Sequence, residues 1–232
     1  MKRLLLVEDD LSIRRYVALA LEDEGFDSID EAGTLSAARQ CLQANAYDLV
    51  LTDLMLPDGH GTELLEALRD DPALRRGARL VAFSAGVAPS MRQRLFDLGV
   101  AQILEKPVSL QALLDCIGAV PAEQAATPAA ELEAEDSAVE RHFGGQRSLF
   151  EEFKAGALRQ FADDLAQGDA LVQGTDVQAL RRLAHSLKTV MRLLGRSDAA
   201  ARAASLENAA QQPGATMPAL LAGWQRLRDE LA

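Results

Sequence analysis

The sequence predicts two domains of different fold class, an α/β domain with a parallel sheet over residues 1–120 and an all-helical domain over residues 137–232. In the first region, short apolar runs alternate with longer amphipathic segments, which is typical of successive βα units. The last region shows helical periodicity only. Between them, residues 121–136 are rich in Ala, Pro and Glu and contain no basic residue, which predicts a linker.

The distribution of charge supports this division. Residues 1–120 carry 12 basic and 19 acidic side chains, residues 121–136 carry none and 5, and residues 137–232 carry 12 and 11. The net charge of −11 argues against non-specific binding to nucleic acid or to an anionic membrane. Much of the hydrophobic content is alanine and only 4% of residues are aromatic, which favours a helix-rich architecture.

Cysteine content and the N-terminus indicate the compartment. Cys41 and Cys116 are too few for a disulfide framework and lack metal-ligand spacing, so we expect buried free thiols in a reducing compartment. The apolar run at the N-terminus ends at Glu8, too early for an export signal. No stretch approaches the ~20 apolar residues of a membrane span. We therefore expect a cytoplasmic protein.

Five apolar runs predict the strands of the first domain, at residues 3–7, 28–32, 48–53, 79–84 and 101–104. Helical patterns lie between them, near residues 11–24, 34–45, 61–70, 89–98 and 108–119. Because the runs do not alternate apolar and polar residues, we expect strands buried on both faces of a parallel sheet with right-handed crossovers.

Polar residues stand where these strands end. Glu8 and Asp9 follow the first strand, Asp53 ends the third, Ser84 ends the fourth, and Lys106 follows the fifth. The carboxyl ends of parallel strands form the ligand crevice of an open α/β sheet. Three carboxylates converging there require a hard cation, and Mg²⁺ is the natural choice. Asp53 is then the candidate nucleophile, with Lys106 and Ser84 placed to bind phosphoryl oxygens.

Four motifs in this region, covering about 120 residues, resemble the receiver domain of two-component response regulators: Val7-Glu-Asp-Asp10, Asp53-Leu-Met-Leu-Pro-Asp-Gly59, Phe83-Ser-Ala85 and Lys106-Pro107. The resemblance implies a five-stranded (βα)5 flavodoxin-like fold in which Asp53 is phosphorylated. It implies further that Mg²⁺ is held by Glu8, Asp9, Asp53 and the backbone carbonyl of Met55. Ser84 and Lys106 would contact the phosphoryl group, and the Lys106–Pro107 peptide bond would be cis.

The sequence departs from that pattern at one position. Many receivers have an aromatic residue three positions before the lysine, where it swings inward on phosphorylation, but this chain has Ile103. The usual aromatic switch is therefore in question. A receiver that passes its phosphoryl group on needs less of that conformational output.

The last region predicts a four-helix bundle. Apolar residues recur at helical spacing in three stripes, and an Ala-rich segment near 197–211 directs Leu206 inward. Antiparallel packing of four such helices buries every stripe. The stripes are Phe150, Phe153, Ala157, Phe161 and Leu165; Leu180, Leu183, Leu187, Val190 and Leu194; and Leu220, Trp224, Leu227 and Leu231.

His185 lies off the second stripe, so we expect it to face solvent. Arg181, Arg182, Lys188 and Arg192 share its side of the helix. This positive charge would keep the imidazole neutral and nucleophilic, stabilise an incoming phosphoryl group and attract an acidic partner. The alternative is a solvated basic face that carries an incidental histidine.

A second resemblance bears on that choice. The motif Ala184-His-Ser-Leu-Lys188, followed by Gly195 and Ser205-Leu-Glu207, resembles a histidine phosphotransfer (HPt) domain, and Phe143-Gly-Gly145 and Gln167-Gly-Asp169 also suit that family. It implies that His185 is a phosphoacceptor with Lys188 beside it. Thr189 replaces a typical glycine, and small residues usually follow where this chain has Val190, Met191 and Arg192. Such bulk is expected to narrow the range of receivers that dock.

The sequence thus yields two functional hypotheses. In the first, the chain is a phosphorelay intermediate without its own ATP-binding kinase domain. A sensor histidine kinase, hybrid or not, or another phosphohistidine donor phosphorylates Asp53, and His185 exchanges phosphate with Asp53 of the chain or with the receiver of a partner protein. In the second, it is a phosphorylation-switched binding protein whose HPt domain is degenerate and only docks. A kinase activity is disfavoured because no Gly-rich phosphate loop is present, and a DNA-binding output because no basic recognition helix follows the receiver.

Overall fold

A computed structural model describes residues 2–22, 24–84, 86–118 and 135–231. The chain divides into two compact units, Met1–Glu123 and Gln124–Ala232, which are described separately. Most of the predicted linker, residues 121–134, lies outside the described residues. Its last two residues, Glu135 and Asp136, belong to the first helix of the second unit.

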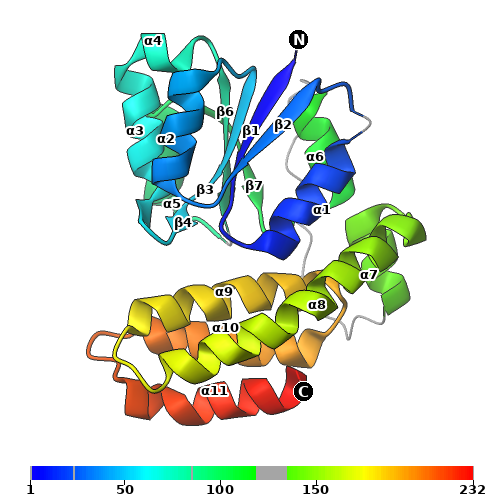
Figure 1. Ribbon diagram of the computed structural model, residues 1–232, viewed down its shortest axis with the longest axis vertical. Helices are drawn as coiled ribbons and strands as arrows, with labels where there is room; N and C mark the ends of the chain where they lie inside the picture. The colour runs from blue at the N-terminus through cyan, green and yellow to red at the C-terminus, as the bar shows by residue number, and fades with distance from the viewer. Residues whose placement is uncertain (1, 23, 85, 119–134, 232) are drawn as a thin grey trace. The chain divides into compact units, whose positions relative to one another are not determined.

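The first unit contains a five-stranded parallel sheet in the order β2-β1-β3-β6-β7 (Figure 1). The five predicted strands are therefore present, and β1, β3 and β6 in the centre are almost wholly buried. Sequence order reverses between β1 and β3, which creates a topological switch point at the carboxyl edge of the sheet. The strands are β1 (Arg3–Val7), β2 (Ser28–Ala32), β3 (Leu49–Asp53), β6 (Arg79–Ser84) and β7 (Val100–Glu105).

Helices cover both faces of this sheet. Helices α1 and α6 pack together on one face, and α2, α3 and α5 share the core of the other (Figure 1). Their bounds are α1 (Leu11–Leu21), α2 (Leu35–Ala44), α3 (Gly61–Asp70), α5 (Pro89–Asp97) and α6 (Leu110–Ile117). The sequence did not predict the short helix α4 (Pro72–Arg75) or the hairpin of β4 (Met55–Leu56) and β5 (Gly59–His60), which follows Asp53 directly.

Of the three acidic residues after β1, only Asp10 caps the following helix. The Asp10 side chain accepts a hydrogen bond from the Ile13 amide at 2.9 Å and so caps α1. Glu8 and Asp9 do not cap this helix and remain available to the edge of the sheet. His60 caps α3 in the same way, accepting from the Thr62 amide at 3.3 Å.

The described part of the second unit consists of helices only. Its long helices lie side by side, with α8 against α9, α9 against α10, α10 against α11 and α11 against α8, while α7 contacts α8 and α9 (Figure 1). The helices are α7 (Glu135–Phe143), α8 (Arg147–Leu171), α9 (Val177–Leu193), α10 (Ser197–Gln211) and α11 (Met217–Leu231). Helix α9 therefore has three neighbours.

The predicted apolar stripes form most of the core of this unit, although Leu165 is only half-buried. Phe143 of α7 packs edge-on against Phe150 of α8, with ring centroids 5.3 Å apart. Trp224 is 1% exposed and lies so close to Gly168 that a Cβ there would come within 2.1 Å of the ring. In the described residues of both units, we find no helix with the length and apolar character of a membrane span.

Candidate functional site

The carboxyl edge of the parallel sheet gathers a cluster of acidic groups. Glu8 and Asp9 after β1 and Asp53 at the end of β3 each offer a carboxylate oxygen, and these oxygens lie within 4.8 Å of one another. The side chains of Glu8 and Asp53 are almost completely buried and Asp9 is half-buried. Three oxygen donors at this spacing fit a hard divalent cation such as Mg²⁺.

Lys106 provides the positive charge in this cluster. Its Nζ lies 2.5 Å from Glu8 Oε2 and 2.7 Å from Asp53 Oδ2, and its side chain is 2% exposed. Residues 98 positions apart are thereby joined at one edge of the sheet. The Lys106–Pro107 peptide bond is cis, as the resemblance to receivers implies.

The pKa values reflect one ammonium facing three carboxylates. Burial raises the pKa of Glu8 well above its usual range, and the Lys106 charge offsets this only in part. Burial, reinforced by the charge of Asp53, raises the pKa of Asp9 to about 6. Burial lowers the pKa of Lys106, but the carboxylates of Asp53 and Glu8 outweigh it and raise the pKa overall. With all three carboxyl groups ionised, the cluster would carry more negative charge than Lys106 alone balances, and the raised pKa values of Glu8 and Asp9 reflect that cost together with burial.

The backbone after Asp53 closes tightly on this residue. The Met55 amide donates to Asp53 Oδ1 at 3.1 Å, and the Gly61 amide donates to the Leu54 carbonyl at 2.9 Å. A Cβ on Gly61 would lie 2.1 Å from the Asp53 carbonyl oxygen, so only glycine permits this approach. The hairpin between them therefore holds Met55 beside the carboxylate cluster.

Ser84 ends β6, between β3 and β7, as expected from the sequence. It is 7% exposed, and its hydroxyl donates to the Gly86 carbonyl at 3.2 Å. Its carbonyl accepts from the Lys106 amide at 2.7 Å, which connects the two strand ends. Ile103, at the position that is aromatic in many receivers, is 3% exposed and belongs to the core.

The second unit contains a different cluster, formed by α9 and α10. His185 Nδ1 lies 2.7 Å from Glu207 Oε1, and Lys188 Nζ donates to Glu207 Oε2 at 2.6 Å. All three side chains are about nine-tenths buried, with exposures of 10–11%. The sequence indicated His185 and Lys188 as site residues but did not identify Glu207 as their partner.

The ionisation of Glu207 fixes the tautomer of the histidine. Burial raises the pKa of Glu207, but the hydrogen bonds and charges of His185 and Lys188 outweigh it and lower the pKa to about 2. The carboxylate is thus ionised at neutral pH and only accepts, so Nδ1 carries the proton. A neutral ring then has its lone pair on Nε2, which is buried and has no hydrogen-bond partner within the described part of the chain.

The prediction that His185 faces solvent is wrong, since the residue is only 8% exposed. A single apolar stripe implies a single covered face, but α9 packs against α7, α8 and α10. This packing buries residues on both sides of the stripe, including Ala184 and Lys188. The environment of His185 is also less basic than expected, because Glu207 contacts both His185 and Lys188.

The departures from the HPt pattern lie mostly inside the helical unit. Val190 and Met191 are 3% and 0% exposed, so their bulk packs in the interior. The Thr189 hydroxyl donates to the His185 carbonyl at 3.3 Å, within the same helix. Only Arg192 is exposed. Of the residues expected to narrow the range of receivers that dock, only Arg192 is therefore placed where it can contact a partner.

Comparison with known proteins identifies the first unit. Residues 4–118 match the family model of the response regulator receiver domain. Together with the five parallel strands and the acidic cluster, this match defines the segment as a receiver domain of the two-component class.

Similar proteins extend the comparison. The chain is 31% identical over 221 residues to the sensory/regulatory protein RpfC of Xanthomonas campestris pv. campestris, covering 88% of this chain and 30% of RpfC. It is 33% identical over 119 residues to the phosphate regulon transcriptional regulatory protein PhoB of Escherichia coli, covering 51% of each. The structure of chemotaxis protein CheY4 of Vibrio cholerae matches 51% of this chain and 97% of its own, with 24% identity and a TM-score of 0.47.

The coverage of these matches differs. The RpfC match takes in more of the chain than the receiver segment, so it continues into the second unit. The chain nevertheless spans only 30% of the length of RpfC and 51% of that of PhoB.

Proposed function

We propose that this chain is a phosphorelay intermediate in which Asp53 and His185 both accept phosphoryl groups. The second unit is then a histidine phosphotransfer domain on a four-helix bundle of α8–α11, and the closed set of contacts among these helices supports this. The observation that carries the relay is the orientation of His185, whose Nδ1 is held by Glu207 while Nε2 is unpartnered within the described residues.

The receiver half of the proposal uses the cluster at the edge of the sheet. Glu8, Asp9, Asp53 and the Met55 carbonyl would hold Mg²⁺, which when bound neutralises charge on the phosphoryl oxygens. Asp53 attacks the phosphorus of a donor phosphohistidine, so that a P–O bond forms as the P–N bond breaks. Lys106 and Ser84 bind the transferred oxygens, and most of the catalysis is positioning and electrostatics.

At the histidine site, the proposed transfer runs in the opposite direction, from an aspartyl phosphate to His185. The Nε2 lone pair attacks the phosphorus of an aspartyl phosphate, a P–N bond forms, and the aspartate carboxylate leaves as the P–O bond breaks. The proton on Nδ1 stays in place, and Glu207 stabilises the positive charge that develops on the ring. Because Nε2 is buried, the surrounding side chains must move when a receiver docks.

The partners of this relay are proteins. We propose that a sensor histidine kinase, hybrid or not, supplies phosphoryl groups, and that the chain exchanges them with its own or another receiver. It then acts as a phosphotransfer intermediate and performs no ATP chemistry of its own.

Phosphotransfer assays on the full chain test this proposal. A panel of kinases and a small phosphodonor such as acetyl phosphate would be offered to the wild type, Asp53→Asn and His185→Gln. We expect Asp53→Asn to lose the alkali-labile label and His185→Gln to lose an acid-labile, alkali-stable label. A His185→Gln variant that takes and passes phosphate like the wild type would disprove the relay.

A second candidate function is a phosphorylation-switched binding protein whose helical unit only docks. The burial of Nε2 favours it, since an acceptor nitrogen covered by side chains is not ready for transfer. In that case label would appear on Asp53 alone, whichever kinase or receiver is added. The same assay therefore separates the two functions.

A further inference from the structure

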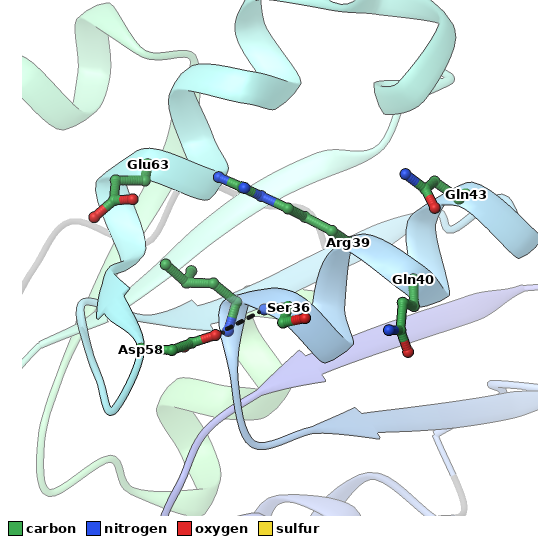
Figure 2. Close-up of a pocket in the computed structure, with 7 residues that line it drawn as sticks. Ser36, Arg39, Gln40, Gln43, Asp58 and Glu63 are labelled. Carbon is green, nitrogen blue, oxygen red and sulfur yellow. Dashed lines mark hydrogen bonds between the residues drawn. The ribbon is translucent and has the colours of Figure 1, made fainter.

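Asp58 connects the segment after Asp53 to a helix that contributes no site residue. It lies at the tip of the β4–β5 hairpin, in which Met55 pairs with His60 and Leu56 with Gly59. Both carboxylate oxygens accept hydrogen bonds from backbone amides at the start of α2. Oδ1 accepts from the Leu35 amide at 2.8 Å. Oδ2 accepts from the Ser36 amide at 2.9 Å, and Figure 2 shows Asp58 beside Ser36.

The negative carboxylate of Asp58 lies at the positive end of helix α2. The first amides of a helix have no partner within the helix, and its N-terminus carries partial positive charge. Loss of some hydration raises the pKa of the exposed Asp58 carboxylate, but the hydrogen bonds from the amides of Ser36 and Leu35 outweigh this and lower the pKa overall. The next amide of α2, that of Ala37, is bonded separately by the Thr34 hydroxyl at 3.0 Å. Two side chains thus cap the same helix, and only Asp58 comes from the hairpin.

The base of the hairpin reaches the phosphorylation site. The Met55 amide donates to Asp53 Oδ1, and Gly61 packs directly on the Asp53 carbonyl. The Leu35 side chain of α2 fills the space beside Gly59, where a Cβ would lie 2.6 Å from Leu35 Cδ1. Contacts therefore run without a break from α2 through the hairpin to the Asp53 carboxylate.

We propose that Asp58 is a positioning residue for the phosphorylation site. A two-stranded hairpin this short is marginal by itself in water, so its position depends on external contacts. By tying the tip to α2, Asp58 keeps the Met55 amide on Asp53 Oδ1 and the Met55 backbone beside the carboxylates. This inference rests on the proposed function of Asp53 and extends it to α2.

Substitution of Asp58 is expected to leave the fold intact. Asp58 borders a polar depression of about 290 Å³ between α2 and α3, lined also by Arg39, Gln40 and Glu63 (Figure 2). Because the residue is exposed there, water can reach the amides that its removal would free.

The test compares Asp58→Ala with Thr34→Ala in the full chain. Each variant removes one cap of α2, but only the first releases the hairpin. Three quantities would be measured: Mg²⁺ affinity by calorimetry, the rate of phosphorylation by acetyl phosphate, and hydrogen exchange of the Met55 amide by NMR without metal. We expect Asp58→Ala to weaken Mg²⁺ binding and slow phosphorylation about tenfold and to speed Met55 exchange. Thr34→Ala should leave all three unchanged at a similar loss of thermal stability.

A third variant and the exchange measurement show whether the effects come from the hydrogen bonds of Asp58. Asp58→Asn retains one acceptor oxygen and should fall between the wild type and Asp58→Ala. Equal behaviour of Asp58→Ala and Thr34→Ala in all three measurements would overturn the inference. If the wild type itself is not phosphorylated at Asp53, the proposed function fails, whereas Met55 exchange and Mg²⁺ affinity still decide the role of Asp58.

Discussion

The two candidate sites use similar groups in different charge balance. In the receiver domain, three carboxylates converge on one ammonium, that of Lys106. In the helical unit, one carboxylate, that of Glu207, accepts from both His185 and Lys188. With its three carboxylates ionised, the first cluster has an excess of negative charge that a divalent cation would balance, whereas in the second the charges of Glu207 and Lys188 neutralise each other. A site whose carboxylates outnumber its cations and a site whose charges are paired should respond differently to the same perturbation.

The sites also differ in how the chain assembles them. Lys106 and Glu8 are separated by 98 positions and meet only when the whole sheet forms. His185 and Glu207 are separated by 22 positions and lie on consecutive helices. The first site therefore depends on the complete receiver core, and the second mainly on the packing of α9 against α10.

The largest expected effect comes from removing each lysine. Lys106→Ala leaves two buried carboxylates without their ammonium, and we expect a loss of about 3–5 kcal/mol in the unfolding free energy of the receiver. Lys188→Ala leaves Glu207 bonded to His185 and should cost the helical unit only about 1–3 kcal/mol.

Urea unfolding measures both, with far-UV circular dichroism for the whole chain and the fluorescence of Trp224, the only tryptophan, for the helical unit. Equal losses for the two lysine variants would contradict the proposed difference in charge balance between the two sites.

Backbone packing in the helical unit gives the next effect. Gly168→Ala places a methyl group about 2 Å from the Trp224 ring, which a 2.9 Å hydrogen bond from its Nε1 to Asp169 helps to fix. We expect a loss of about 1–3 kcal/mol in the unfolding free energy of this unit. Gly156→Ala is a matched control in the same helix, since its Cβ would meet only Arg159 Nη2 at 4.0 Å. It should gain up to about 1 kcal/mol, and a loss there would contradict the explanation.

Metal dependence tests the charge balance directly. In the presence of a chelator, Asp9→Asn removes one of three converging carboxylates and should stabilise the receiver by about 1 kcal/mol. Added Mg²⁺ should then raise the melting temperature of the wild-type receiver more than that of Asp9→Asn. The Trp224 transition of the helical unit should not move. A Mg²⁺ response in both units, or in neither, would refute the contrast.

The smallest expected effect is a change in acid stability. A carboxyl group whose pKa falls on folding stabilises the fold above its unfolded value, and that contribution is lost as the pH falls. For Glu207 the window runs from the ordinary 4.5 to about 2. Glu207→Gln should lose less stability than the wild type as the pH falls through that window, because glutamine has no carboxyl group to protonate.

Trp224 fluorescence during acid titration measures this change. Glu230→Gln is the control, because it alters an exposed pair with Arg202 in the same unit. If both variants follow the wild-type curve, the Glu207 contact contributes nothing to acid stability.

Much of the receiver site was predictable from the sequence. Glu8, Asp53 and Lys106 each stand at or just after the end of an apolar run, and parallel strands bring such positions to one edge. The hairpin after Asp53 was not predicted, because strands of two residues leave no run to detect. The bonds from Asp58 to α2 were therefore also missed, although Asp-Gly is a recognised turn signal.

The histidine site was only half predictable. His185 and Lys188 are visible in a short motif, but burial depends on how many helices surround α9. One signal for Glu207 was available: it lies four positions after Ala203 and three before Ala210, on the buried face of an Ala-rich helix. A charged residue on an apolar stripe indicates a buried partner, since an unpaired buried charge is costly.

The sequence by itself determined the two fold classes, the strand ends that carry the acidic cluster, and the residue types at both sites, because these follow from periodicity along the chain. Only the tertiary structure decided that His185 is buried, that Glu207 holds its Nδ1, and that Asp58 ties the β4–β5 hairpin to α2. These are contacts between elements, and their formation depends on which helices and turns become neighbours. Local periodicity does not encode that choice, because it results from the packing of the whole unit.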